Sequence, residues 1–134
     1  MDIATREARN TDIPAIAELF DLYRQFYEQS ANLSLAQQFI TDRLSSGESV
    51  ILVADSASSG LVGFCQLYPT FCSVEAQPIY ALYDLFVLSS ARRSGVGRML
   101  LLAAEAKAAK EGKARMDLTT ARTNNTAQSL YEAL

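Results

Sequence analysis

The sequence contains no histidine, and this absence excludes several kinds of catalytic and metal site. Serine–histidine–aspartate triads and cysteine–histidine dyads both need an imidazole, as do most zinc sites. The two cysteines, Cys65 and Cys72, are too far apart in the sequence to form a C-x-x-C redox motif. Any chemistry that this chain performs is therefore performed without imidazole, and we expect no metal.

Long apolar runs and an excess of positive charge are also missing. Polar residues interrupt every apolar run well before the length of about 18 residues that suggests a membrane span. The segment Met1–Arg9 has no apolar stretch typical of a secretion signal, so we expect a cytoplasmic protein that does not bind membranes. The 12 Lys and Arg residues against 15 Asp and Glu residues give a net charge of −3. Because charge-driven nucleic-acid binders are basic, we expect no direct nucleic-acid binding.

What the sequence does contain is the length and composition of one globular domain, with 134 residues, 49% of them apolar and 20% charged. Ser34 and Gln37 have the spacing of a capping box at the start of a helix. Hydrophobic periodicity predicts strands over residues 3–8, 50–54, 61–68, 79–87 and 114–120, and helices over 13–27, 34–46, 95–110 and 125–134. This order predicts a mixed α+β fold with antiparallel central strands and one βαβ crossover.

A glycine-containing junction between a strand and a helix is the most informative segment. After the strand that ends near residue 88 come Arg92 and Arg93, and then Gly95 and Gly97 open a helix that also carries Arg98. Glycines let backbone N–H groups approach a ligand, and a helix N-terminus attracts anions. The segment lacks the lysine of a P-loop and the third glycine of a Rossmann loop. It therefore predicts a diphosphate site of another kind, with a flexible turn bearing solvated arginines as the alternative.

Two motifs resemble those of one protein family. The pattern Arg92-x-x-Gly95-x-Gly97 resembles the R/Q-x-x-G-x-G/A signature of the GNAT superfamily of N-acetyltransferases, which holds the pyrophosphate of acetyl-CoA. The segment Asn124–Glu132 resembles the N-x-x-A-x-x-L-Y-E segment of the same family, and the order of elements agrees along the chain. Within the family, the chain looks most like the branch that includes yeast histone and polyamine acetyltransferases. The resemblance implies a GNAT-like fold and binding of acetyl-CoA as a cosubstrate.

The resemblance also implies which residues bind the cosubstrate. The backbone at the end of the family's fourth strand would lie along the pantetheine and the thioester, and the loop that follows would hold the diphosphate. Asn124 resembles a residue that contacts the pantetheine arm, although it could equally cap the last helix. The residues implied in binding are Leu85, Phe86, Val87, Arg92, Arg93, Ser94, Gly95, Val96, Gly97, Arg98 and Asn124.

Two residues are candidates for proton transfer. Asp84 is an acidic residue in an otherwise apolar strand, so it is either a base or amine-binding group or a partner in a structural hydrogen bond to a neighbouring loop. Tyr131 resembles the family's general acid, which protonates the leaving sulfur, but it could instead pack against the sheet. Glu75 is a second carboxylate that could meet a cationic acceptor, or a solvated loop residue. Cys65 is expected to be a core thiol, because nothing activates it.

These features predict an acetyl-CoA-dependent N-acetyltransferase that occupies residues 1–134 as one domain. The acceptor would be a polyamine, another small primary amine or a lysine-like group, which attacks the thioester directly in a ternary complex. The alternatives are a non-catalytic acyl-CoA sensor of the same fold and an unrelated phosphate-binding protein. Family members usually continue with two further strands, whereas this sequence stops at Leu134, so we expect a C-terminally short sheet and a homodimer that covers its open edge.

Overall fold

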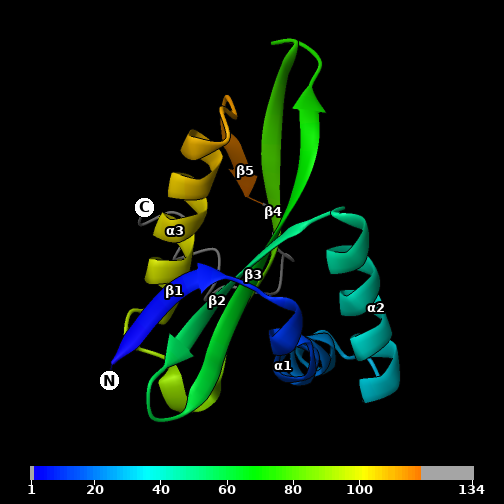
Figure 1. Ribbon diagram of the computed structural model, residues 1–134, viewed down its shortest axis with the longest axis vertical. Coiled ribbons are helices and arrows are strands. Elements are labelled where there is room, and N and C mark those ends of the chain that lie inside the picture. The colour runs from blue at the N-terminus through cyan, green and yellow to red at the C-terminus, as the bar shows by residue number, and fades with distance from the viewer. Residues whose placement is uncertain (1, 119–134) are drawn as a thin grey trace.

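Five strands form one mixed sheet in the order β1-β2-β3-β4-β5 (Figure 1). The computed structural model describes residues 2–118. Neighbouring strands from β1 to β4 run antiparallel, and β4 and β5 run parallel across the α3 crossover. The mixed α+β architecture and the βαβ crossover predicted from the sequence are confirmed. The strands are β1 (Ile3–Glu7), β2 (Val50–Ser56), β3 (Gly60–Cys72), β4 (Gln77–Val87) and β5 (Met116–Leu118).

Helices cover both faces of the sheet, which explains why its central strands are apolar on both sides. In β2, Leu52 and Ala54 pack in the cluster that contains α3, whereas Ile51 and Val53 pack in the cluster that contains α1 and α2. Because strand side chains alternate between faces, α3 lies on one face and the other two helices on the opposite face (Figure 1). The α-helices are α1 (Ile13–Phe26), α2 (Leu33–Ser46) and α3 (Val96–Lys110), and two short 3₁₀ helices are η1 (Asn10–Asp12) and η2 (Ser89–Ala91). In the described part of the chain, no helix has the length and apolar character required to span a membrane.

The start of α2 differs from its prediction. The helix begins at Leu33, and its cap is Asn32, whose side chain accepts a hydrogen bond from Leu35 N at 3.1 Å. The predicted capping box of Ser34 and Gln37 is therefore wrong. Asparagine is one of the best N-cap residues, and here it caps the helix two residues before the predicted Ser34.

The β3–β4 hairpin is longer than the sequence pattern suggests. Its strands remain paired out to Cys72 and Gln77, beyond the predicted ends at residues 68 and 79. This arm projects from the rest of the sheet (Figure 1), and Phe71 and Val74 near its end are 75% and 97% exposed. Without a buried face, the arm has no alternation of apolar and polar residues that would reveal its pairing. The helix predicted over 125–134 and the end of the strand predicted over 114–120 lie outside the described residues.

Candidate active site

The candidate site lies along the C-terminal half of β4, which begins at an irregularity in its pairing with β3. Gln66 pairs with Asp84, but the next residue of β3, Leu67, pairs with Leu82, so Tyr83 is an extra residue that forms a bulge. On the other side, β5 pairs with β4 only from Tyr80 to Leu82, as far as the described residues extend. The C-terminal half of β4 stays paired with β3 from Asp84 to Val87. The described part of β5 does not extend along this half.

Along this half of β4, the backbone N–H and C=O groups of successive residues face alternately toward β3 and away from it. Leu88 N donates to Val62 O at 2.8 Å, so the backbone of Phe86, two residues earlier, also faces β3. The N–H and C=O groups of Leu85 and Val87 consequently face away from β3. Of the three strand residues that the resemblance implies in binding, Leu85 and Val87 therefore have backbone groups directed away from β3, and Val87 O accepts a hydrogen bond from Arg92 Nε. Phe86 contributes its ring to the core.

The loop after β4 leads directly to the N-terminus of α3. Arg93 and Gly95 adopt left-handed backbone angles, with φ of +66° and +79°. Val96 is buried and anchors the first turn, while Met99 N donates to Gly95 O at 3.0 Å. The N–H groups of the first helical residues have no partner within the helix, so they are available to an anion. The expected diphosphate loop is thus the N-terminus of a 15-residue helix.

Arginine side chains gather at the same place. Arg92 Nε donates to Val87 O at 2.8 Å, and its guanidinium lies 5.6 Å from the centre of the Phe86 ring. Arg92 thereby links the loop to the end of β4, and the residue is exposed. Arg93 in this loop and Arg98 in the first turn of α3 are also exposed. Within the loop, Ser94 and Gly95 are also exposed and Gly97 is half-buried.

Asp84 is the acidic group of the site. Its Oδ2 accepts a hydrogen bond from Gln66 Nε2 at 2.8 Å, and the Tyr23 hydroxyl of α1 is a further partner. Burial raises the pKa of Asp84 above its usual range, and the hydrogen bonds from Gln66 and Tyr23 oppose this rise. Asp84 does make a structural hydrogen bond, but its partner Gln66 lies in strand β3 and not in a loop, as the alternative had predicted. This hydrogen bond coexists with a shift of the pKa in the direction that a base requires.

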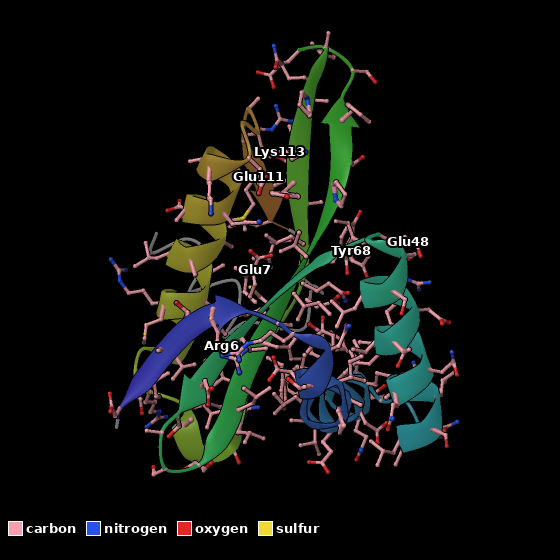
Figure 2. The ribbon with its side chains drawn as sticks, in the orientation of Figure 1. Arg6, Glu7, Glu48, Tyr68, Glu111 and Lys113 are labelled. Carbon is pink, nitrogen blue, oxygen red and sulfur yellow. The ribbon has the colours of Figure 1, made fainter. Side chains whose placement is uncertain are left out.

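Aromatic residues surround Asp84 on two sides. Tyr23 contacts Tyr27 edge to face with ring centres 5.1 Å apart, and its hydroxyl lies 3.3 Å from the backbone oxygen of Tyr83. The ring of Tyr83 packs against that of Tyr68 at 5.5 Å. Burial and the Asp84 charge raise the pKa of Tyr68 to about 12, so this phenol stays protonated at neutral pH. Tyr68 lies on β3 near Glu48, at the end of α2 (Figure 2).

Sequence reasoning did not find the polar partners of Asp84. Gln66 and Ser49 belong to no motif that the sequence reveals. Tyr23 is one of several aromatic residues at helical spacing on one face of the predicted helix. Only the strand register and the packing of α1 bring these residues to Asp84. A polar residue between Cys65 and Leu67, in a strand otherwise built for burial, was the one available signal.

The remaining candidate residues from the sequence are Asn124, Tyr131, Glu75 and Cys65. Asn124 and Tyr131 lie outside the described residues. Glu75 forms an ion pair with Arg115 in the turn of the β3–β4 hairpin, as expected of a solvated loop residue. Cys65 is fully buried, and burial raises the pKa of its thiol to about 12, which confirms a core thiol. Among the residues that the structure describes, no group of three or more potential ligands could hold a metal ion.

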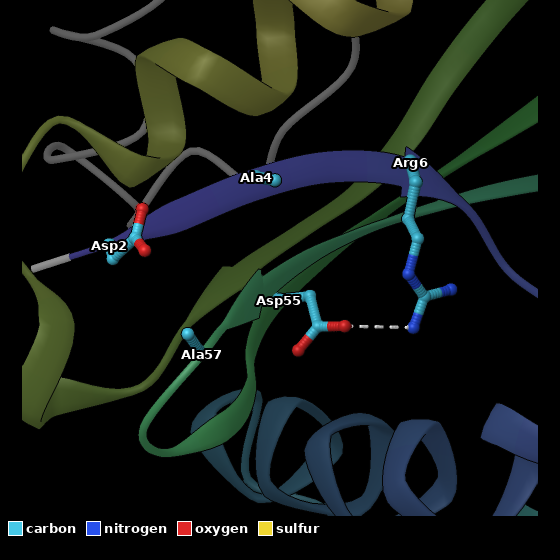
Figure 3. A pocket seen from close by; sticks show the side chains of 5 residues that line it. All are labelled: Asp2, Ala4, Arg6, Asp55 and Ala57. Atoms are coloured by element: carbon cyan, nitrogen blue, oxygen red, sulfur yellow. Dashed lines mark hydrogen bonds and ion pairs between the residues drawn. The ribbon is translucent and has the colours of Figure 1, made fainter.

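A cavity of about 260 Å³ lies elsewhere, at the outer edge of the sheet between β1 and β2 (Figure 3). It is lined by Asp2, Ala4, Arg6, Asp55 and Ala57. The Arg6 guanidinium there is already bound by Asp55 at 3.1 Å and by Asp12 at 2.7 Å. Since its cation is neutralised internally, this cavity has no free charge for an anionic ligand.

Comparison with known proteins agrees with the geometry of β4 and its loop. Residues 15–134 match the sequence model of the acetyltransferase (GNAT) family. The uncharacterized N-acetyltransferase YhfO of Bacillus subtilis (strain 168) is 46% identical over 127 residues, which are 95% of this chain and 85% of the relative. A crystal structure of a probable acetyltransferase is 35% identical, with a TM-score of 0.88 and coverage of 99% of this chain and 87% of the other.

A more distant structure shares the fold and contains a ligand. AAC(6')-Iy, in complex with the bisubstrate analogue CoA-S-monomethyl-acetylneamine, is 18% identical with a TM-score of 0.83, and the match covers 99% of this chain and 89% of the other. At this identity the likeness concerns the fold alone. The family match over residues 15–134, together with the relative at 46% identity, shows that this chain belongs to the acetyltransferase (GNAT) family of enzymes.

Proposed function

We propose that the protein transfers the acetyl group of acetyl-CoA to a primary amine. The observation that carries this proposal is the continuity of two binding surfaces. The backbone groups of Leu85 and Val87 that face away from β3 lead toward the N-terminus of α3, and Arg92 links Val87 to the loop between them. A long ligand with a diphosphate near one end and a thioester at the other matches this sequence of backbone donors and cationic loop.

The cosubstrate is held by this chain's own groups. The backbone N–H groups of residues 93–98 and the side chains of Arg92, Arg93 and Arg98 would bind the diphosphate. The backbone of Leu85 and Val87 would bind the pantetheine arm and stabilise the negative charge on the thioester oxygen. Asn124 would contact the pantetheine arm. We infer that residues 1–134 act together as one catalytic domain.

Asp84 would accept the proton that the acceptor amine must lose. A free alkyl amine has a pKa near ~10.4, so it is protonated at neutral pH and cannot attack. Asp84 passes this first proton to solvent. The neutral nitrogen then forms the C–N bond and loses its second proton to Asp84. As the C–S bond breaks, the thiolate of CoA takes a proton from Tyr131, which regains one from solvent. Because Asp84 must be ionised to act as the base, activity should fall as the pH falls through its raised pKa.

The acceptor combines a cation with an apolar part. One carboxylate lies between the Tyr23–Tyr27 pair and the Tyr68–Tyr83 pair, and aromatic faces attract ammonium groups. This arrangement supports a small primary amine, a polyamine or a lysine-like group. The narrower resemblance to histone and polyamine acetyltransferases remains a prediction, as does a cytoplasmic location.

Two measurements test the proposal. Acetyl-CoA and CoA should raise the melting temperature of the protein, whereas ATP should have little effect. A free-thiol assay with polyamines, arylalkyl amines, amino acids and lysine peptides should then detect CoA release with at least one class of amine. Binding of acetyl-CoA without release by any amine would instead identify a sensor, and no binding would refute the proposal.

Tyr131→Phe tests the proposed acid. The ring is retained and only the hydroxyl is lost, so turnover should fall by about 10²-fold with little change in acetyl-CoA affinity. Near-normal turnover between pH 6 and 9 would show that solvent protonates the thiolate.

A further inference from the structure

A chain of three polar side chains crosses the interior beside the candidate site. Ser49 Oγ donates to Gln66 Oε1 at 2.7 Å, and Gln66 Nε2 donates to Asp84 Oδ2 at 2.8 Å. Gln66 is completely buried and Ser49 is 7% exposed. Burying a polar side chain is costly unless its hydrogen bonds are made, so this chain must retain both bonds to be tolerated.

The partners at each end fix the orientation of the Gln66 amide. An ionised carboxylate can only accept hydrogen bonds, so the NH₂ group of Gln66 must face Asp84. Its carbonyl oxygen then faces Ser49, whose hydroxyl can donate to it. The hydroxyl of Ser49 satisfies the carbonyl oxygen in this orientation and so helps to hold the NH₂ group against the base.

We propose that Gln66, oriented by Ser49, is a positioning residue that holds Asp84 ionised and directed for proton transfer. This inference rests on the proposed function, because it assigns Asp84 the role of the base. It adds two residues to the site that have no direct contact with either substrate. They act only through the carboxylate.

The groups around Asp84 make this contribution necessary. In residues 2–118, the hydrogen bonds that lower the pKa of Asp84 come from two neutral donors, Gln66 and Tyr23, while burial raises it. Burial and the Asp84 charge raise the pKa values of Cys65 and Tyr68 of β3, so this thiol and this phenol stay neutral. Removing Gln66 therefore removes one of the two bonds that favour the charged carboxylate.

Gln66→Leu is the direct test, because it keeps a similar volume and deletes the donor. The acidic limb of the pH profile of kcat should move upward by about one pH unit or more, as expected for a lost hydrogen bond to a charged group. Ser49→Ala should move the limb in the same direction by less, with KM for acetyl-CoA unchanged in both variants. Cys65→Ala, a matched core truncation on the same strand without a bond to Asp84, should leave the limb in place.

A second readout does not depend on turnover. The carboxyl ¹³C resonance of Asp84, assigned by its loss in Asp84→Asn, should titrate at a higher pH in Gln66→Leu than in the wild type. An unmoved titration in Gln66→Leu would overturn the positioning role, even if acetyl transfer is observed. If no amine is acetylated but the titration moves, the proposed function fails while the coupling between Gln66 and Asp84 stands.

Discussion

At the scale of single residues, the ionised Asp84 carboxylate is proposed to serve acetyl transfer, but its burial lowers the free energy of unfolding. Burial raises its pKa in the folded protein, so the folded state binds this proton more tightly than the unfolded state does. The resulting stabilisation is present below the unfolded pKa and is lost as the pH rises through the folded pKa. At neutral pH the ionised carboxylate is therefore a cost to the fold, which its hydrogen bonds reduce.

Asp84→Asn should separate the two effects. Turnover should fall by about 10²-fold or more because the base is lost. The melting temperature at pH 7 should be equal to or higher than that of the wild type, since the amide does not titrate. Melting curves between pH 4 and 8 measure this, with the exposed Asp42→Asn as the control. A large loss of stability in Asp84→Asn at pH 7 would contradict the argument.

The sequence identified Asp84 and Cys65 but not the partners that define their surroundings. A carboxylate in an apolar strand is conspicuous, and so is a thiol without an activating base. Gln66 became significant only through its register opposite Asp84, and that register depends on the bulge at Tyr83. Neither long-range pairing nor a bulge has a local signature in this stretch of residues.

At the scale of elements, one ion pair fastens β1 to the start of α1. Arg6 of β1 binds Asp12 of η1 through two nitrogens, at 2.7 and 3.0 Å, and Asp12 also accepts from Arg9 N at 2.7 Å. The Arg6 guanidinium lowers the pKa of Asp12 to about 2. Stability from this carboxylate is therefore present above its unfolded pKa and is lost as the pH falls toward 2.

Asp12→Asn should lower the melting temperature at pH 7 by a few degrees, because the ion pair is lost. The difference from the wild type should shrink as the pH is lowered from 4 to 2, where the wild-type carboxylate also becomes neutral. Thermal unfolding followed by circular dichroism over this range measures the difference. A gap that stays constant down to pH 2 would show that the charge of Asp12 does not contribute.

The N-terminus of α3 leads to a prediction about ligand binding. Gly97→Asp places a negative charge where the diphosphate is proposed to bind, so CoA affinity should fall at least about tenfold. The helix itself should persist, because an acidic residue in the first turn suits the helix dipole. Calorimetric titration with CoA, with Gly97→Ala as the uncharged control, measures the change. Equal affinity in the wild type and Gly97→Asp would place the diphosphate elsewhere.

The helices and strands that could be predicted from the sequence are those with a buried face. The helices and the central strands were found because one or both of their faces pack in the core, which imposes a period on the sequence. The projecting part of the β3–β4 hairpin, around Phe71, was missed because its pairing relies on backbone hydrogen bonds. The loop at the start of α3 was found because Gly95 and Gly97 mark a backbone requirement that periodicity does not encode.

At the scale of the whole molecule, the projecting hairpin bears on the predicted homodimer. Phe71 and Val74 are 75% and 97% exposed near the end of this arm. The arm projects away from the N-terminus of α3 (Figure 1). Exposed apolar groups on a protruding element are typical of surfaces that associate. We expect two copies to bury these side chains against each other, with the two sites remaining accessible.

Sedimentation analysis over a range of protein concentrations tests this association. The wild type should sediment as a dimer at high concentration, and the double variant Phe71→Ser with Val74→Ser should sediment as a monomer. CoA release per chain should be the same in both, because these residues lie outside the proposed site. A wild type that remains monomeric at every concentration would refute the dimer. A double variant that remains dimeric would move the interface to another surface, such as the open edge of β1.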